Sequence, residues 1–360
     1  MSSHDHKIAD DPQPSRDEVC RATIDLPKRP DRRGMLLGTL AGIGALGIGS
    51  ARAVEVHAPT EQQAAASTAA TETDSQPAGR PDLEAILTGK VAVVTGAARG
   101  IGRSIAVEFA ANGADFVGLD ICRPASAHTL YPHSTRADLD ETERLVASRG
   151  RRFTPIVTDI RDIAALRAAA KSVSDKIGRI NIVVADAGIQ PFQPLLEMTD
   201  AQWHEPIDVN LNSTANTIRA FGPALMAAGG GRIIVVASMQ GRYGTKNGSS
   251  YSASKWGVLG LMKSAALELG EHKITVNAIV PGLIDTLMTR NETRWKLAMA
   301  AADGRVVNEP TEAQAAAVLK PYSPPELHWL NPDQIAPAAV FLASDGAAIV
   351  TGGNSAQNTA

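Results

Sequence analysis

Cysteine is scarce in this chain of 360 residues, which holds only Cys20 and Cys122. Two cysteines cannot build the disulfide framework that stabilises many small secreted domains. The eight histidines do not have the spacing of metal ligands, so no catalytic metal is expected. The net charge of −3 gives no sign of a nucleic-acid partner. Aromatic residues make up only 4%, whereas glycine and alanine are abundant, which fits close packing of helices against a sheet.

The apolar run at residues 34–49 is too short to span a membrane. It follows the pair Arg32-Arg33 and precedes an A-x-A cleavage pattern that ends at Ala53. This order predicts a twin-arginine export signal over residues 1–53. We therefore expect a periplasmic or otherwise exported protein with no stable membrane insertion after cleavage. The alternatives are a retained membrane anchor, or a chance arginine pair in a cytoplasmic protein.

The segment after the signal differs in composition from the rest of the chain. Residues 54–81 are rich in Ala, Thr, Gln and Glu and have no apolar period, which predicts a flexible linker. The folded domain is expected over residues 82–360. No internal repeat is present.

From Gly89 onward, apolar β-branched segments alternate with helical patterns. The predicted strands are Lys90–Thr95, Asp115–Leu119, Phe153–Thr158, Ile180–Ala185, Arg232–Ala237 and Ile274–Val280. Strands that alternate with helices predict an α/β fold: a doubly wound parallel sheet of the Rossmann type, in three α/β/α layers with right-handed crossovers. Ligands of such sheets bind at the carboxyl ends of the strands.

The turn after the first strand carries the motif Gly96-x-x-x-Gly100-x-Gly102, and a helix is predicted from Arg103 to Asn112. Glycines let the backbone approach a pyrophosphate, whose charge meets the helix N-terminus. A turn that serves tight packing alone is the alternative, but its place between strand and helix favours a dinucleotide site.

The second strand ends at Asp120. Its carboxylate can accept hydrogen bonds from both hydroxyls of a ribose and would repel a 2′-phosphate. Arg99 could attract a phosphate, but the acid counts for more. The sequence therefore predicts NAD as cofactor, in preference to NADP.

A second motif, Tyr251-x-x-x-Lys255, begins a helical pattern downstream of the strand that ends near Ser238. The spacing i, i+4 puts the phenol and the ammonium on one helix face. A neighbouring Lys⁺ favours the phenolate, so this pair suits proton transfer to or from an alcohol oxygen. Taken alone, such a tyrosine is more often a packing residue.

These motifs together make the chain, from about Leu87 to Gly352, resemble the short-chain dehydrogenase/reductase family. The resemblance implies that Tyr251 acts as acid/base on the substrate oxygen and that Ser238 hydrogen-bonds the same oxygen. Lys255 would lower the pKa of Tyr251 and hold the nicotinamide ribose, and Asn210 would position a water that links Lys255 to solvent. The activity implied is NAD-dependent interconversion of a secondary alcohol and a ketone by hydride transfer.

The resemblance also implies the binding residues. The cofactor set is Gly96, Arg99, Gly100, Ile101, Gly102, Asp120, Ile121, Asp159, Ile160, Ala187, Gly188, Tyr251, Lys255, Pro281, Gly282, Ile284 and Thr286. The substrate candidates are Gln190, Phe192, Met239 and Tyr243, which suggest a largely apolar alcohol or ketone. A helical lid is expected over about residues 283–330, with apolar candidates Met288, Trp295, Leu297, Met299, Tyr322 and Trp329. A homodimer or homotetramer is implied, with helices near Asn210–Phe221 and Ser252–Leu269 at a two-fold axis.

The chain departs from the family pattern at three places. Asp186 stands where the family usually has asparagine, so a backbone acceptor usually capped there is expected to lose its donor. The tail after Thr351-Gly352-Gly353 is polar, which predicts a last strand that is short or absent.

The third departure is an insertion, Cys122–Asp140, which resembles that of a carveol-dehydrogenase-like subgroup thought to hold NAD without exchange. It is expected to cover the adenine ribose and trap the cofactor, or else to be a solvated loop.

Two other functions are compatible with the same motifs. One is a non-catalytic nucleotide-binding module, although the presence of Ser238, Tyr251, Lys255 and Asn210 argues against it. The other is a sugar-nucleotide epimerase-like enzyme, which shares the Tyr/Lys pair but usually has a larger C-terminal substrate domain.

Overall fold

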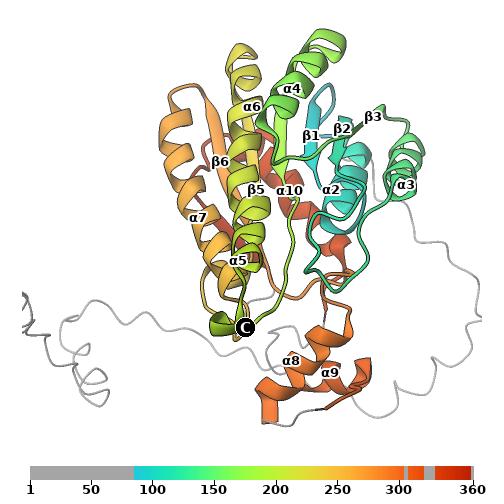
Figure 1. Ribbon diagram of the computed structural model, residues 1–360. Helices are drawn as coiled ribbons and strands as arrows, with labels where there is room; N and C mark the ends of the chain where they lie inside the picture. Colours follow the sequence, from blue (N-terminus) through green and yellow to red (C-terminus); the bar gives the residue numbers. More distant parts are fainter. Residues whose placement is uncertain (1–84, 304–306, 320–328, 358–360) are drawn as a thin grey trace, which may run out of the picture. The chain divides into compact units, whose positions relative to one another are not determined.

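The computed structural model describes residues 85–303, 307–319 and 329–357 (Figure 1). Seven parallel strands form one sheet in the order β3-β2-β1-β4-β5-β6-β7. They are β1 (Val91–Thr95), β2 (Asp115–Asp120), β3 (Phe153–Val157), β4 (Ile182–Ala185), β5 (Gly231–Val236), β6 (Ile274–Pro281) and β7 (Asn354–Gln357). The predicted doubly wound parallel sheet is confirmed, and the first six strands begin and end within two residues of the predicted bounds.

Helices cover both faces of the sheet and make the three layers visible in Figure 1. On one face lie α2 (Gly100–Ala111), α3 (Arg136–Ala147) and α10 (Ala336–Ala343). On the other lie α4 (Ile163–Ile177), α6 (Ser213–Ala227) and α7 (Ser249–Gly270). Because each central strand has a hydrophobic core on both sides, strands such as β1 and β4 are buried throughout.

The predicted helix at Arg103–Asn112 begins earlier, at Gly100, because the glycine-rich turn runs directly into helical backbone. Part of the insertion is also regular: residues from Arg136 onward form the first turn of α3. Thr135 and Asp138 close a capping box there, each side chain bonding the other's backbone N–H. Residues 121–135 remain as the loop proper, called the cofactor loop below.

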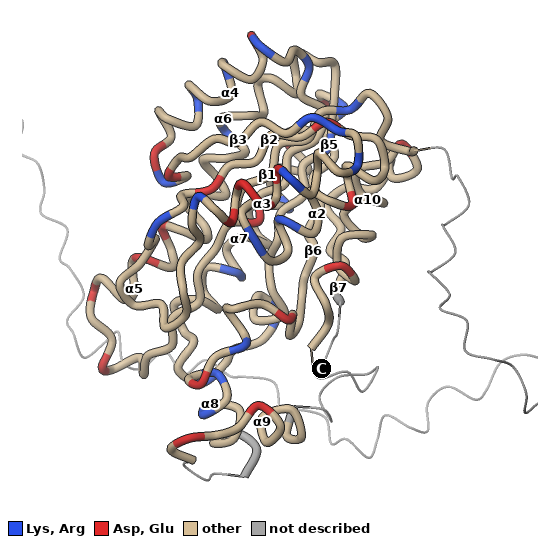
Figure 2. Tube along the Cα trace, turned by 90° about the vertical axis from the view of Figure 1, so that its right-hand side faces the viewer, with Lys and Arg blue, Asp and Glu red and all other residues tan. Residues whose placement is uncertain are grey.

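The last strand exists and is short. Asn277 of β6 fixes the segment before it, since its side chain accepts from the Gly353 N–H (3.1 Å) and donates to the Val350 carbonyl (2.7 Å). β7 then pairs with β6 from Ala278 to Pro281, and Figure 2 shows the two strands side by side at the sheet edge.

The predicted helical lid contains α8 (Glu292–Asp303) and α9 (Glu312–Leu319), which lie beyond the carboxyl ends of the strands in both views (Figures 1 and 2). Its base is closed by Ile284 and Leu330, which form a parallel bridge. Among the described residues, no helix combines the length and apolar character needed to cross a membrane. The predicted signal (1–53), the linker (54–81) and the lid candidate Tyr322 lie outside the described residues.

Candidate active site

A cavity of about 1140 Å³ opens at the carboxyl ends of the strands, between the glycine-rich turn, the cofactor loop and the lid. It is lined by every predicted site residue except Gly102, Asn210 and Phe192. Residues from seven separate stretches of sequence thus meet in one space. The volume exceeds that of a usual site for one small molecule and suits a dinucleotide with a second ligand.

The glycine-rich turn depends on its glycines for close packing. A Cβ on Gly102 would lie 2.2 Å from the Gly96 carbonyl oxygen, and one on Gly96 would lie 2.9 Å from the Ala187 backbone. Gly100 has a φ of +59°, in the left-handed region. The Arg99 side chain does not cap the start of α2. The Gly102 N–H of its first turn is directed to the Asp186 carboxylate, and the N–H groups of Gly100 and Ile101 can meet an anion.

Asp120 is buried at the end of β2 and holds both the turn and the cofactor loop. Its carboxylate accepts from Ala98 N (3.1 Å), Cys122 N (3.0 Å) and the Ser134 hydroxyl (2.6 Å). A carboxylate offers about four acceptor positions. Three are therefore taken within the chain, which leaves about one for a ribose hydroxyl instead of the two that were expected.

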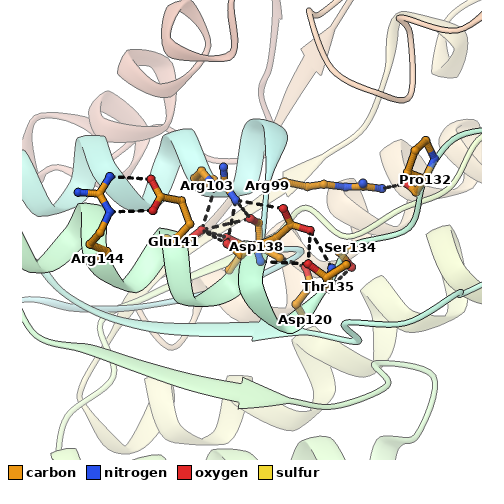
Figure 3. A network of polar contacts seen from close by, with 12 residues as sticks. Arg99, Arg103, Asp120, Pro132, Ser134, Thr135, Asp138, Glu141 and Arg144 are labelled. Carbon is orange, nitrogen blue, oxygen red and sulfur yellow. Dashed lines mark hydrogen bonds and ion pairs between the residues drawn. The ribbon is translucent and has the colours of Figure 1, made fainter.

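The cofactor loop lines the cavity on one side, although several of its residues, such as Leu130, are exposed. Arg99 reaches from the glycine-rich turn to the Pro132 carbonyl (2.5 Å), as Figure 3 shows together with the Asp120–Ser134 contact. Farther along, the Tyr131 hydroxyl accepts from Gln190 N (3.1 Å), on the substrate side. Burial raises the pKa of Tyr131 to about 12, so it stays a neutral phenol.

The loop is also clasped to α5 (Asp200–Pro206). Glu205 accepts hydrogen bonds from Ser126 and from His128, whose Nδ1 lies 2.8 Å away. Burial alone would raise the pKa of Glu205, but these two partners outweigh it and lower the pKa. The group formed by Ser126, His128 and Glu205 is called the clasp below; no spacing in the sequence marked it.

Ser238, Tyr251 and Lys255 come together around one side of the cavity. The Ser238 hydroxyl accepts from Gln240 N (3.2 Å) and lies near enough to the phenol of Tyr251 to act on its pKa. Lys255 Nζ donates to the Val236 carbonyl (2.8 Å) and lies 5.8 Å from the centroid of the Tyr251 ring. Burial raises the pKa of Tyr251, and Ser238 and the positive charge of Arg294 act in the opposite direction.

Lys255 interacts with a half-buried acid, Asp186, at the position where the family usually has asparagine. Burial raises the pKa of Asp186 to about 7, partly offset by Lys255 and by a hydrogen bond from the Gly102 N–H. Burial likewise lowers the pKa of Lys255 to about 8, and Asp186 opposes this. The carboxylate therefore has its own backbone donor at Gly102.

Asn210 lies on a π-helical segment, Ile207–Asn212, between α5 and α6. Its side chain accepts from Ile189 N (2.8 Å) and donates to the Ile189 carbonyl and the Ser254 hydroxyl (3.0 Å each). Both amide N–H groups are thus used, so a bridging water could bind this side chain only as a donor. A Cβ on Gly188 would lie 3.1 Å from Asn210 Oδ1 and 3.6 Å from Lys255 Nζ, which shows how closely the two approach.

The loop after β6 faces the glycine-rich turn. Thr286 Cγ2 would lie 3.3 Å from a Cβ on Gly100, so the two walls of the cavity meet there. Asp159, after β3, is held by Arg161 through two short contacts (2.6 and 2.9 Å), and this pairing lowers its pKa. Asp159 and Thr286 both line the cavity, and their contact with a cofactor stays a prediction.

The lid contributes two residues that sequence reasoning did not single out, Arg290 and Arg294. Arg294 Nη1 donates to Gln190 Oε1 (2.9 Å), and its guanidinium lies 5.2 Å from the centroid of the Phe192 ring. Of the apolar lid candidates, Met288 lines the cavity and Met299 is buried. No group of three or more side chains suited to a metal ion occurs in the described ranges.

Comparisons with known proteins agree with this geometry. Residues 90–297 match the family model of the short chain dehydrogenases. An uncharacterised NAD-dependent oxidoreductase of Mycobacterium tuberculosis is 42% identical over 270 residues, covering 74% of this chain and 93% of the relative. The (−)-trans-carveol dehydrogenase of Rhodococcus erythropolis is 34% identical, covering 73% and 94%. The crystal structure of a carveol dehydrogenase from Mycobacterium avium in complex with NAD has a TM-score of 0.72 at 37% identity, covering 75% and 96%.

Proposed function

Because the chain belongs to the short-chain dehydrogenase family, we propose that it interconverts a secondary alcohol and a ketone with NAD, on a substrate that is apolar over most of its surface. The observation that carries the proposal is that Ser238, Tyr251 and Lys255 line one cavity, with Lys255 Nζ 5.8 Å from the centroid of the Tyr251 ring. In oxidation, Tyr251 takes the hydroxyl proton of the alcohol while Ser238 holds its oxygen. Bound NAD supplies the hydride acceptor in that direction and the hydride donor in the other.

The residues present fit NAD. The uncapped start of α2 can receive a pyrophosphate, and Asp120 keeps an acceptor position for ribose while its charge opposes a 2′-phosphate. Lys255 and Thr286 line the part of the cavity where the resemblance puts the nicotinamide end. The relatives named above with NAD in their names support the same choice.

Retention of the cofactor is part of the proposal. The cofactor loop is fixed at both ends of the cavity, through Ser134 to Asp120 and through Tyr131 to Gln190. Release of a dinucleotide would require these contacts and the clasp to open. A retained cofactor would have to be reoxidised in place by a second substrate or an external electron acceptor.

Two further proposals concern the whole protein. Export through the twin-arginine route, with the signal at residues 1–53 and the linker at 54–81, is compatible with a cofactor that is carried in the folded protein. Assembly through α6 and α7 is supported by Trp256 and Leu267 of α7, which are exposed large apolar side chains.

The test is turnover of a panel of cyclic and aryl secondary alcohols, followed by absorbance of reduced nicotinamide and by product analysis. Tyr251→Phe should lower kcat/KM by about 10² to 10⁴-fold, the usual contribution of acid–base catalysis. Ser252→Ala is the matched control, since it removes the neighbouring hydroxyl, which has no hydrogen-bond partner. Equal turnover by Tyr251→Phe and wild type would exclude this mechanism, and isomerised product without net oxidation would favour the epimerase-like alternative.

A further inference from the structure

Arg294 is the feature of the substrate side that an apolar substrate does not explain. It lies on α8, is half-buried and lines the cavity. Its side chain contacts two residues after β4: it donates to Gln190 Oε1 and lies over the ring of Phe192. A guanidinium has five N–H donors, so the single bond to Gln190 leaves most of them for another acceptor.

No carboxylate of the described chain pairs with Arg294. Burial lowers its pKa, and the groups that oppose this effect are the phenols of Tyr251 and Tyr243. The other lid arginine is different, since Arg290 is paired with Asp285 (2.7 Å) and with Glu312 and lies 4.3 Å from the centroid of the Trp329 ring. A partly desolvated cation without a counter-charge costs free energy, which an anionic ligand would offset.

Gln190 adds a second donor beside this charge. Arginine can only donate, so the amide atom that faces it must be oxygen, and the Gln190 nitrogen is left as a donor. Arg294 and Gln190 therefore offer only N–H groups to the cavity, close enough to Tyr251 for the charge to act on the catalytic phenol.

We propose that Arg294, assisted by Gln190, binds a carboxylate of the substrate, so that the substrate is a secondary alcohol or ketone that also carries a carboxylic acid. This rests on the proposed function for the position of the reacting oxygen at Tyr251. A carboxylate fits better than a phosphate because, of the two lid arginines that line the cavity, Arg294 has no carboxylate partner among the described residues, whereas Arg290 is already neutralised. Met239 and Met288 supply apolar surface for the remaining skeleton.

The experiment compares acids with their neutral counterparts. The probes are 3-hydroxybutanoate and 4-hydroxycyclohexanecarboxylate, each beside its methyl ester, with NAD-loaded protein. We expect kcat/KM to favour at least one acid over its ester by about tenfold to a hundredfold, the range of a charge-assisted hydrogen bond. Arg294→Gln should abolish this preference, Arg294→Lys should restore part of it, and Arg290→Gln should leave the acid-to-ester ratio unchanged.

Binding without turnover separates this proposal from the proposed function. Calorimetry of NAD-loaded Tyr251→Phe with 4-oxocyclohexanecarboxylate and with acetoacetate should show binding of at least one acid, lost when Arg294→Gln is added. If alcohols are oxidised but no acid is preferred, or the preference survives in Arg294→Gln, the carboxylate site is wrong and the dehydrogenase stands. If acids bind through Arg294 and no alcohol is oxidised, the dehydrogenase is wrong and the anion site stands.

Discussion

The clasp offers a direct measurement of how firmly the cofactor loop is held. In Glu205→Gln the acceptor for Ser126 and His128 loses its charge. A buried hydrogen bond to a charged group contributes about 1.5–3 kcal/mol to stability. The His128 and Glu205 side chains are 28% and 26% exposed, so solvent weakens their interaction. We therefore take about 1 kcal/mol for each bond. The closed loop should therefore lose about 1–2 kcal/mol, which raises the open population about five- to thirtyfold.

The assay loads the protein with NADH and follows its fluorescence after mixing with excess NAD. If loop opening limits release, the dissociation rate should rise by the same factor in Glu205→Gln. His128→Ala should give a smaller increase, because the bond from Ser126 to Glu205 remains. The double variant should show little more than Glu205→Gln, because both changes act on the His128–Glu205 bond. Glu271→Gln, at the exposed end of α7, is the control. An unchanged dissociation rate with an unchanged Tm would refute the idea that the clasped loop retains the cofactor.

Three other predictions test the cavity walls. Gly102→Ala should destabilise the fold by about 3 kcal/mol in denaturant unfolding, because its Cβ meets the Gly96 carbonyl, whereas Gly260→Ala on α7 meets nothing within 4 Å. Asp120→Ser should raise the affinity for NADP relative to NAD at least tenfold in titration, since the charge that opposes a 2′-phosphate is lost. The raised pKa of Asp186 means that this one carboxyl binds more proton in the folded state than in the unfolded chain between about pH 4 and 7. Wild type should therefore lose stability relative to Asp186→Asn as the pH rises through that window; parallel stability curves would contradict the assignment.

The strands of the sheet and the positions of Ser238, Tyr251 and Lys255 could be predicted because short segments of sequence determine them. β-branched runs mark the strands, and the glycine-rich motif marks the turn that needs Gly100 in a left-handed conformation. Ser238, Tyr251 and Lys255 were placed correctly along the chain because a strand end and one helical turn are sufficient to position them. Even the short β7 follows from a polar tail that offers little to bury.

The contacts of the cofactor loop and of the lid, which enclose the cavity, could not be predicted in the same way. The path of a loop over 15 residues is set by contacts to distant elements, such as Glu205 of α5, and no period or spacing encodes them. Arg294 lies in a helix whose sequence contains no recognisable motif. From the sequence alone, it is indistinguishable from an arginine on a solvent-exposed helix face. Asp186 was expected to leave a backbone acceptor without its donor, and that expectation stays a prediction. The hydrogen bond to the carboxylate itself comes from the Gly102 N–H, in the turn after another strand, and no sequence spacing indicates it.

Gln190 forms hydrogen bonds both with the cofactor loop and with the lid. Its backbone N–H donates to Tyr131 of the cofactor loop, while its side chain accepts from Arg294 of the lid. It lies in the loop after β4, which ends at Ala185, and it is buried, so it has little freedom to move independently of the sheet. A displacement of α8 that shifts Gln190 must therefore strain or lengthen the hydrogen bond to Tyr131, because the amide hydrogen bond tolerates only small changes in geometry. Gln190, in the segment after β4, therefore couples the lid, under which the substrate would bind, to the loop that would retain the cofactor.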